Sequence, residues 1–305
     1  MEILDAQIHT WLSDRPTHPW TTSYRQQFSA QLGILIHAGL SMSPEAVLGE
    51  MAEAGVDGGA LAPIGVYGVD NRFELAAAHR YPRKYCVVGW TDHVAPNAGD
   101  QLLDDVAAGM RGVRILSLRE PERLRRQEFD PVLRACQRHG CAVSLPLRHP
   151  IATELIELFA RFDDITFLID HLGLGHAPLI MGPRPAEPFA DLGAVLELAK
   201  LPNVVLKLTG APALSQLEFP FPDLFPFIEQ IVSAFGVERV AWGSDFTRTG
   251  GLFSYWDGTH YLAQMPGVSP DDLAWLYGKA LRKALNWPSN PHVRSGPVND
   301  RVQGV

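Results

Sequence analysis

The chain has 305 residues, a formal net charge of −8, 46% hydrophobic and 20% charged residues. These proportions are ordinary for a globular protein and exclude a disordered chain. The negative charge argues against nucleic acid as a partner, because phosphate binding needs clustered Lys and Arg. No apolar run reaches the ~18 residues of a membrane span, so we expect no membrane partner.

The three cysteines, Cys86, Cys136 and Cys141, are an odd number and lack a CxxC spacing. The sequence therefore predicts neither a disulfide framework nor a zinc knuckle, and a reducing compartment fits. The N-terminal segment lacks a basic region followed by an apolar one, which is the pattern of a secretory signal. We expect a cytoplasmic protein.

Eight short apolar segments have the character of strands, and stretches with helical character separate them. A βα unit repeated eight times predicts a parallel sheet that closes into a (β/α)8 TIM barrel. An open doubly wound sheet is the alternative, but no Gly-rich phosphate turn follows any of these segments. The predicted strands are Glu2–Ile8, Gly58–Pro63, Tyr85–Thr91, Met110–Ser117, Gly140–Leu147, Ile165–Asp170, Asn203–Thr209 and Arg239–Ser244.

Two helix starts carry clear end signals. Ser43 precedes Pro44 and Glu45, and Ser269 precedes Pro270 and two aspartates. A capping Ser, a Pro at the first helical position and acids in the first turn are typical of a helix N-terminus. We predict helices from these points to about residue 54 and about residue 285.

The domain prediction is one barrel over residues 1–288 and an irregular tail over 289–305, where the sequence shows no periodicity. Long loops follow the first, sixth and seventh strands, at residues 10–39, 173–188 and 210–226. Long loops on a barrel usually carry function, so we expect the first two to cover the mouth.

Polar residues follow the first, sixth and eighth predicted strands. They include His9, the pair Asp170 and His171, and Asp245. The carboxyl ends of barrel strands meet at one rim, where such barrels keep their chemistry. Strand eight also neighbours strand one, so His9, His171 and Asp245 are expected to converge at the mouth.

The alternation of side chains along a strand assigns each residue to a face. It predicts that Asp5, Gln7 and His9 point into the barrel and that the apolar residues between them face the helices. On strand six it predicts that His171 shares a face with Phe167 and Ile169 and that Asp170 points to the other face. We interpret Asp170 as a structural residue.

Four segments resemble the amidohydrolase superfamily: DAQIHTW at 5–11, LIDHLG at 168–173, VVLKLTG at 204–210 and WGSDF at 242–246. They are most similar to a branch of TIM-barrel hydrolases that includes sugar lactonases and 2-pyrone-4,6-dicarboxylate lactonase and is related to non-oxidative decarboxylases. The similarity runs from residue 2 to about residue 287. The resemblance implies hydrolysis or decarboxylation at the mouth, with Asp245 as the strand-eight base and His171 as the strand-six histidine.

Members of this family usually begin with His-x-His, a pair that binds a divalent metal, whereas this chain has Gln7 in the first position. An amide oxygen is a poor zinc ligand beside imidazole and carboxylate. Two alternatives stay open. His9, His171 and Asp245, with His149 as a further candidate, hold one divalent ion, most naturally zinc; or the site is metal-free, as in some lactonases of this branch.

The functional prediction is an enzyme, a hydrolase of a small lactone or related cyclic ester. Asp245 takes a proton from water that attacks the acyl carbon, while His9 and His171 polarise the carbonyl. The alternatives are a metal-dependent decarboxylase of an aromatic acid and a non-catalytic barrel that binds a small molecule. The sequence leaves a homo-oligomer open.

The predicted substrate contacts come from the rim. Guanidinium groups favour a carboxylate, so we expect an acid-bearing lactone, with a neutral sugar lactone as the alternative. The aromatic residue of this set, Trp11, either lines the substrate pocket or packs in the core. The residues are Gln7, Arg114, Arg148, His149, Lys207, Arg248 and Trp11.

Overall fold

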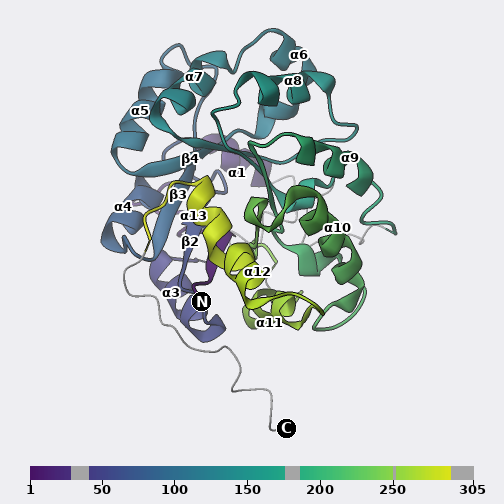
Figure 1. The fold of residues 1–305 in the computed structure, drawn as a ribbon. Coiled ribbons are helices and arrows are strands. Elements are labelled where there is room, and N and C mark those ends of the chain that lie inside the picture. Colours follow the sequence, from purple (N-terminus) through teal and green to yellow (C-terminus); the bar gives the residue numbers. More distant parts are fainter. Residues whose placement is uncertain (29–40, 176–185, 250–251, 290–305) are drawn as a thin grey trace.

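The computed structural model describes residues 1–28, 41–175, 186–249 and 252–289. Eight parallel strands form one sheet in chain order, and a parallel bridge between Ile8 and Phe246 links the segment after the last strand to the first strand. The predicted (β/α)8 barrel is confirmed (Figure 1). The strands are β1 (Leu4–Ile8), β2 (Gly58–Leu61), β3 (Tyr85–Trp90), β4 (Met110–Arg114), β5 (Ala142–Leu145), β6 (Phe167–Ile169), β7 (Val204–Lys207) and β8 (Val240–Ala241).

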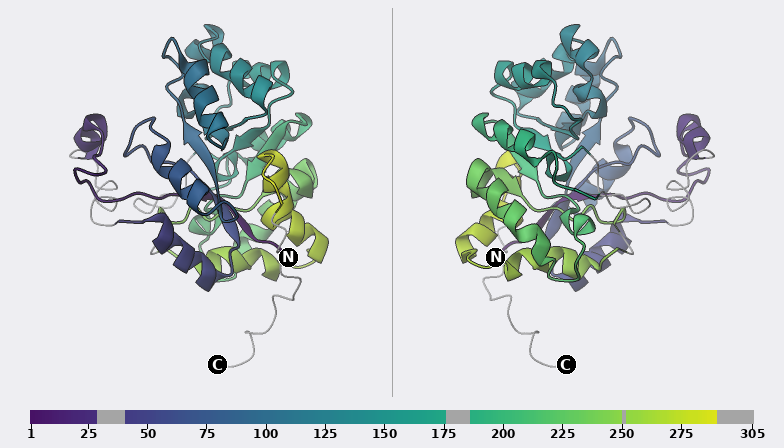
Figure 2. Two further views of the ribbon diagram at one scale, coloured as in Figure 1. Left: turned by 90° about the vertical axis from the view of Figure 1, so that its left-hand side faces the viewer. Right: turned by 90° about the vertical axis from the view of Figure 1, so that its right-hand side faces the viewer.

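Helices surround the sheet, and two of them mark the ends of the barrel. Figure 2 shows α1 standing out at the end where the loop after β1 lies, and α13 at the opposite end. The α-helices are α1 (Thr22–Phe28), α3 (Pro44–Ala54), α4 (Arg72–Arg80), α5 (Ala98–Ala107), α6 (Pro121–Arg125), α7 (Asp130–His139), α8 (Thr153–Arg161), α9 (Leu192–Glu197), α10 (Phe225–Phe235), α11 (Tyr255–His260), α12 (Pro270–Ala274) and α13 (Ala280–Ala284).

Both predicted helix starts are confirmed. Ser43 accepts a hydrogen bond from the amide of Ala46, and Ser269 accepts one from Asp272 and completes a capping box. A π-helical turn joins α12 to α13, so the helix predicted to end near residue 285 is continuous to Ala284.

All eight predicted strands are present, and each is shorter than predicted. The largest differences are at β5 and at β8, which contains only Val240 and Ala241. The chain leaves the strand before Asp245, whose φ of 57° lies in the left-handed region. Few side chains other than Gly adopt this conformation, so the residues after β8 form a turn instead of extending the strand.

The barrel interior is filled mainly by small and aliphatic side chains. Leu4 and Ala6 of β1 share one buried cluster with residues from six other strands, a set that only the inside of the barrel can bring together. Leu281 and Leu285 close this cluster at the α13 end. A second, larger cluster fills the layer between the strands and the helices.

The prediction for the faces of β1 is wrong for its first residues. Leu4 and Ala6 lie inside the barrel, whereas Asp5 contacts Tyr255 of the outer helix α11. The pairing of β1 with β2 shifts register between Asp5 and Ile8. An irregularity of this kind moves the residues after it to the other face, so Gln7 still reaches the barrel centre.

Other sequence predictions concern the loops, the cysteines and the membrane. The three cysteines are free and buried, as predicted. Across the described ranges, no helix is both long and apolar enough to cross a bilayer. Parts of the first two predicted long loops, at 29–40 and 176–185, and the tail from residue 290 onward lie outside the described residues.

Glu74 of α4 is a carboxyl group enclosed by the fold. Its side chain is 1% exposed, and neither of its oxygens has a hydrogen-bond partner among the described residues. Burial, with a smaller contribution from the negative charge of Asp70, raises the pKa of Glu74 to about 8. The folded protein therefore keeps Glu74 protonated at a pH where an unfolded chain releases the proton.

Glu74→Gln is expected to remove a pH dependence of stability. Between its ordinary pKa of 4.5 and about 8, only the folded state holds the Glu74 proton, so the free energy of unfolding falls as pH rises. The slope is up to roughly 1.4 kcal/mol per pH unit. Thermal unfolding should show the variant close to wild type at about pH 5 and clearly more stable at about pH 8. The exposed Glu50→Gln is the control, and an equal stability difference at both pH values would contradict the assignment.

Candidate active site

Asp245 lies at the mouth of the barrel, in the turn after β8, and is 1% exposed. Its Oδ1 accepts a hydrogen bond of 2.8 Å from Gln7 Nε2 and lies 3.0 Å from His9 Nε2. Its Oδ2 accepts no hydrogen bond from the described part of the chain. One oxygen is thus held by the protein and the other is left for a water or substrate.

The charge state of Asp245 follows from its neighbours. Burial alone raises the pKa of its carboxyl group, but the hydrogen bond to His9 and the charges of His171, His9 and Arg248 lower it by more. The net pKa lies well below its ordinary value. Asp245 is therefore a carboxylate at neutral pH, the form that can accept a proton.

His9 contacts Asp245 and the backbone. Its Nδ1 lies 2.5 Å from the carbonyl oxygen of Ala62, and its Nε2 faces Asp245. Both partners are acceptors, so both contacts are hydrogen bonds only when each ring nitrogen carries a proton. Burial lowers the pKa of His9, while Asp245 raises it in opposition. His9 is thus held between the carbonyl of Ala62 and Asp245, and it orients the carboxylate through Nε2.

His171 lies two residues after the end of β6 and, like Asp245, has a positive φ, of 52°. Its Nδ1 lies 3.4 Å from the carbonyl oxygen of Thr209, and its Nε2 has no hydrogen-bond partner within the described ranges. Burial lowers the pKa of His171, and the charges of Asp245 and Asp170 raise it in part. Non-Gly residues in this strained region cluster at functional sites.

Asp170 is the centre of a charged cluster inside the barrel. Its Oδ1 lies 2.8 Å from Lys207 Nζ and accepts a hydrogen bond of 2.6 Å from Ser144, while its Oδ2 accepts one of 2.8 Å from Arg114. Burial raises the pKa of Asp170, but Lys207 and Arg114 hold it well below its ordinary value. Burial lowers the pKa of Lys207 and the charge of Asp170 opposes this shift, so the ammonium of Lys207 depends on its pairing with the carboxylate that Arg114 also binds.

The structural role expected for Asp170 agrees with this cluster, and Asp170 lies on the face of β6 opposite Phe167 and Ile169, as predicted. Leu168, two residues earlier, belongs to the interior cluster, and Asp170 points to the same side. Phe167 and Ile169 face the helices. His171 leaves the strand through its positive φ, so alternation from β6 does not apply to it.

Gln7 connects the two polar groups. Its Oε1 accepts a hydrogen bond of 2.8 Å from Lys207 Nζ, and its Nε2 donates to Asp245. The reverse orientation would place an NH2 group against the ammonium and an oxygen against the carboxylate. The two charges therefore fix the orientation of the amide.

The other predicted substrate residues have different surroundings. Arg114 is already bonded to Asp170, and Trp11 is fully buried, which favours packing over a substrate wall. His149 Nε2 donates to the carbonyl of Gly173 at 2.7 Å. The remaining two, half-buried Arg248 and exposed Arg148, form no ion pair with any described residue. Arg248 acts electrostatically on Asp245, so it lies near the mouth.

No sequence pattern indicated how the turn at Asp245 is held. Asp5 accepts hydrogen bonds from the amide and hydroxyl of Ser244 and one of 2.8 Å from the hydroxyl of Tyr255. Burial raises the pKa of Asp5 to about 6 despite these donors. The outward direction of Asp5, which the strand alternation concealed, ties β1 to the residue before Asp245.

The expected zinc ligands do not form a zinc site. His9 Nε2 and Asp245 Oδ1 are 3.0 Å apart, but no group of three or more His, Cys, Asp and Glu residues in the described ranges could hold a metal ion. The Gln7 oxygen is directed at the ammonium of Lys207. The donor set therefore does not fit a divalent metal.

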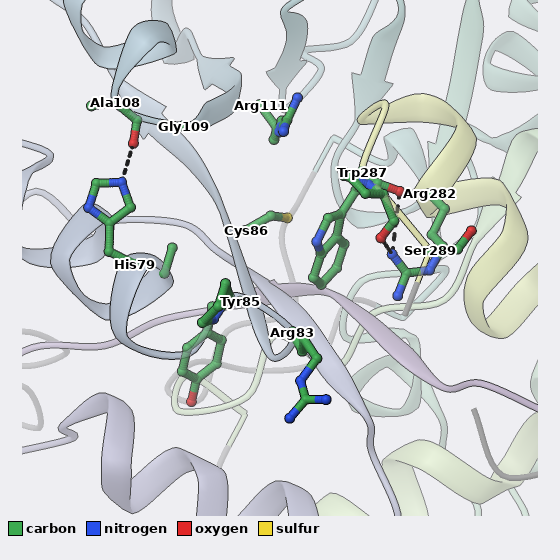
Figure 3. Close-up of a pocket in the computed structure, with 13 residues that line it drawn as sticks. His79, Arg83, Tyr85, Cys86, Ala108, Gly109, Arg111, Arg282, Trp287 and Ser289 are labelled. Atoms are coloured by element: carbon green, nitrogen blue, oxygen red, sulfur yellow. Dashed lines mark hydrogen bonds between the residues drawn. The ribbon is translucent and has the colours of Figure 1, made fainter. Parts of the chain in front are cut away.

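A cavity of about 320 Å³ lies at the opposite end of the barrel, where β3 and β4 begin (Figure 3). On its border His79 donates a hydrogen bond of 2.7 Å to the carbonyl of Ala108. Arg282 of α13 pairs with Glu2 and donates a hydrogen bond to the carbonyl of Trp287. These contacts fasten the helices to the barrel floor, and we interpret this cavity as structural.

The chain is similar to known amidohydrolases and lactone hydrolases. An amidohydrolase family model matches residues 4–286. The chain is 27% identical over 207 residues to a 4-sulfomuconolactone hydrolase of Hydrogenophaga intermedia, covering 66% of this chain and 63% of the relative. It is 28% identical over 187 residues to an L-fucono-1,5-lactonase of Burkholderia ambifaria, covering 58% and 60%. The alignments span less than two thirds of these relatives.

A solved structure shows the same fold. An amidohydrolase from Burkholderia multivorans with bound zinc superposes with a TM-score of 0.76 at 20% identity, covering 94% of this chain and all of that one. The resemblance carried by the four sequence segments is confirmed by these matches. The chain belongs to the amidohydrolase family.

Proposed function

We propose that this protein hydrolyses a small lactone and that Asp245 activates the attacking water. The observation that carries the proposal is a buried carboxylate at the barrel mouth whose Oδ2 has no hydrogen-bond partner among the described residues. His171, whose charge acts on it, has an Nε2 that also has no partner among them. Two relatives named as lactone hydrolases support the reaction class.

In the proposed reaction, Oδ2 of Asp245 accepts a proton from water as the water oxygen bonds to the lactone carbonyl carbon. The ring oxygen then leaves as an alkoxide and takes that proton, so the product is a hydroxy acid. His171 Nε2 is the nitrogen available to the carbonyl oxygen, and it donates to it when the ring carries a second proton. His9 and Gln7 hold Oδ1 and so aim Oδ2.

A lactone suits this set of residues better than an amide. An ester carbonyl is the more electrophilic of the two, and its alkoxide leaves more readily than an amine, so less electrostatic help is needed. The donor set around Gln7 supports a metal-independent reaction. It does not favour the metal-dependent decarboxylation of an aromatic acid, the alternative that the family resemblance left open.

Arg248 is the cation best placed for a substrate carboxylate. It is half-buried, acts electrostatically on Asp245 and His9, and has no ion-pair partner within the described residues. Arg114, by contrast, already forms an ion pair with Asp170. We therefore propose that the substrate is an acid-bearing lactone whose carboxylate pairs with Arg248.

Arg248→Met is expected to raise KM for an acid-bearing lactone roughly 10- to 100-fold, because charged hydrogen bonds contribute about 1.5–3 kcal/mol. The methyl ester of the same lactone should show little change. Arg148→Met is the matched control, since Arg148 is exposed on the loop after β5. Equal effects of Arg248→Met on acid and ester would contradict the pairing.

Chelator is expected to leave lactone turnover unchanged. A panel of acid-bearing and neutral lactones can be screened with a pH indicator, because hydrolysis releases a proton. The same panel is then repeated after dialysis against a chelator. Activity lost on chelation and regained with zinc would overturn the metal-independent mechanism, and binding without turnover would favour a non-catalytic barrel.

A further inference from the structure

We infer that the ammonium group of Lys207, together with Gln7, takes the place of a divalent metal in this barrel and excludes one from the site. The role of Lys207 in catalysis rests on the proposed function, whereas the exclusion of a metal does not depend on it. The inference starts from the position of Gln7, where related proteins usually carry a metal-binding histidine.

Lys207 is built into the barrel as a coordinated cation. Its side chain is 3% exposed, and Nζ lies 2.8 Å from both Gln7 Oε1 and Asp170 Oδ1. The carbonyl oxygen of Ala6 and the hydroxyl of Ser144 lie at 3.5 Å. Oxygen atoms from β1, β5 and the end of β6 thus surround one fixed positive charge.

The negative charge that a metal would need is already neutralised. Asp170 is paired with both Lys207 and Arg114, so it has no net charge left for a divalent ion. A buried charge persists only when it is paired in this way. Removing the ammonium would leave Asp170 with Arg114 alone.

A metal ion bound to the oxygen of Gln7 would lie close to the ammonium group of Lys207. The oxygen of Gln7 is 2.8 Å from Nζ, and a zinc–oxygen bond is roughly 2.2 Å long, so the two cations could be no more than about 5 Å apart. Like charges at this distance inside a protein repel strongly. A histidine introduced at position 7 alone would meet the same repulsion.

Gln7 also links the orientation of Asp245 to Lys207. With its oxygen on the ammonium, its NH2 group must face the carboxylate, and it donates to Oδ1 at 2.8 Å. The lysine and the amide therefore act together to orient Asp245 through its Oδ1.

The test is zinc uptake, measured by equilibrium dialysis and mass spectrometry on wild type, Gln7→His, and the double variant Gln7→His/Lys207→Met. We expect no stoichiometric zinc in wild type or Gln7→His, and one zinc in the double variant, bound at least about 10-fold more tightly than in Gln7→His. Gln7→His/Lys200→Met is the matched control, because Lys200 is exposed on the surface. Circular dichroism verifies folding, and Gln7→His/Lys207→Gln serves if the methionine variant is unfolded.

The opposite pattern would overturn the inference. Three results would show that Lys207 does not exclude the metal. They are stoichiometric zinc in wild type, equal zinc affinity of Gln7→His and the double variant, and a folded double variant that binds no zinc. Zinc binding is measured without substrate. A failed lactonase assay therefore leaves them unaffected, and the two proposals fail separately.

Discussion

Replacing Asp245 by Asn is expected to lower kcat at least ~100-fold while the barrel stays folded. The amide cannot accept the proton of the attacking water, although its oxygen can still accept hydrogen bonds from Gln7 and His9. The steady-state rate of lactone hydrolysis measures the effect. Circular dichroism and thermal unfolding establish that the fold is intact.

The control for this variant is Asp163→Asn, which changes an exposed carboxylate in the turn after α8 and should leave kcat unchanged. A folded Asp245→Asn protein with a rate near that of wild type would show that another group is the base. His171 would then be the next candidate, because its Nε2 is unshared among the described contacts.

Asp170→Asn is expected to lower the free energy of unfolding by about 3–5 kcal/mol, the usual cost of breaking a buried ion pair. The asparagine keeps the shape of the side chain but removes the negative charge that neutralises Lys207 and Arg114. Denaturant unfolding monitored by circular dichroism gives the value.

A surface pair provides the comparison. Glu122→Gln breaks the contact with Arg125 on exposed side chains and should cost far less stability than Asp170→Asn. If the two variants cost the same, Asp170 does not neutralise Lys207 and Arg114 inside the barrel.

Local patterns made the fold predictable. Apolar runs marked all eight strands, and the Ser-Pro starts at Ser43 and Ser269 marked two helices, because capping and strand burial depend on residues close in sequence. Closure of the barrel then placed Asp245 beside His9, as expected. Strand ends were overestimated where the chain turns through a positive φ, as at Asp245.

The rest of the site depends on geometry that a sequence pattern does not contain. The register shift in β1 reversed the predicted direction of Asp5, and alternation along β6 could not place His171, because its positive φ takes it out of the strand. The contact between Gln7 and Lys207 joins side chains 200 residues apart. Such contacts follow only from the folded barrel.

Hydrolysis in ¹⁸O-labelled water tests most directly the claim that Asp245 directs water to the acyl carbon of a lactone. With an acid-bearing lactone that wild type turns over, mass spectrometry should find one labelled oxygen in the newly formed carboxylate of the hydroxy acid. Asp245→Asn should form this product at least ~100-fold more slowly. Label in the hydroxyl group, or release of carbon dioxide in place of a hydroxy acid, would contradict the account.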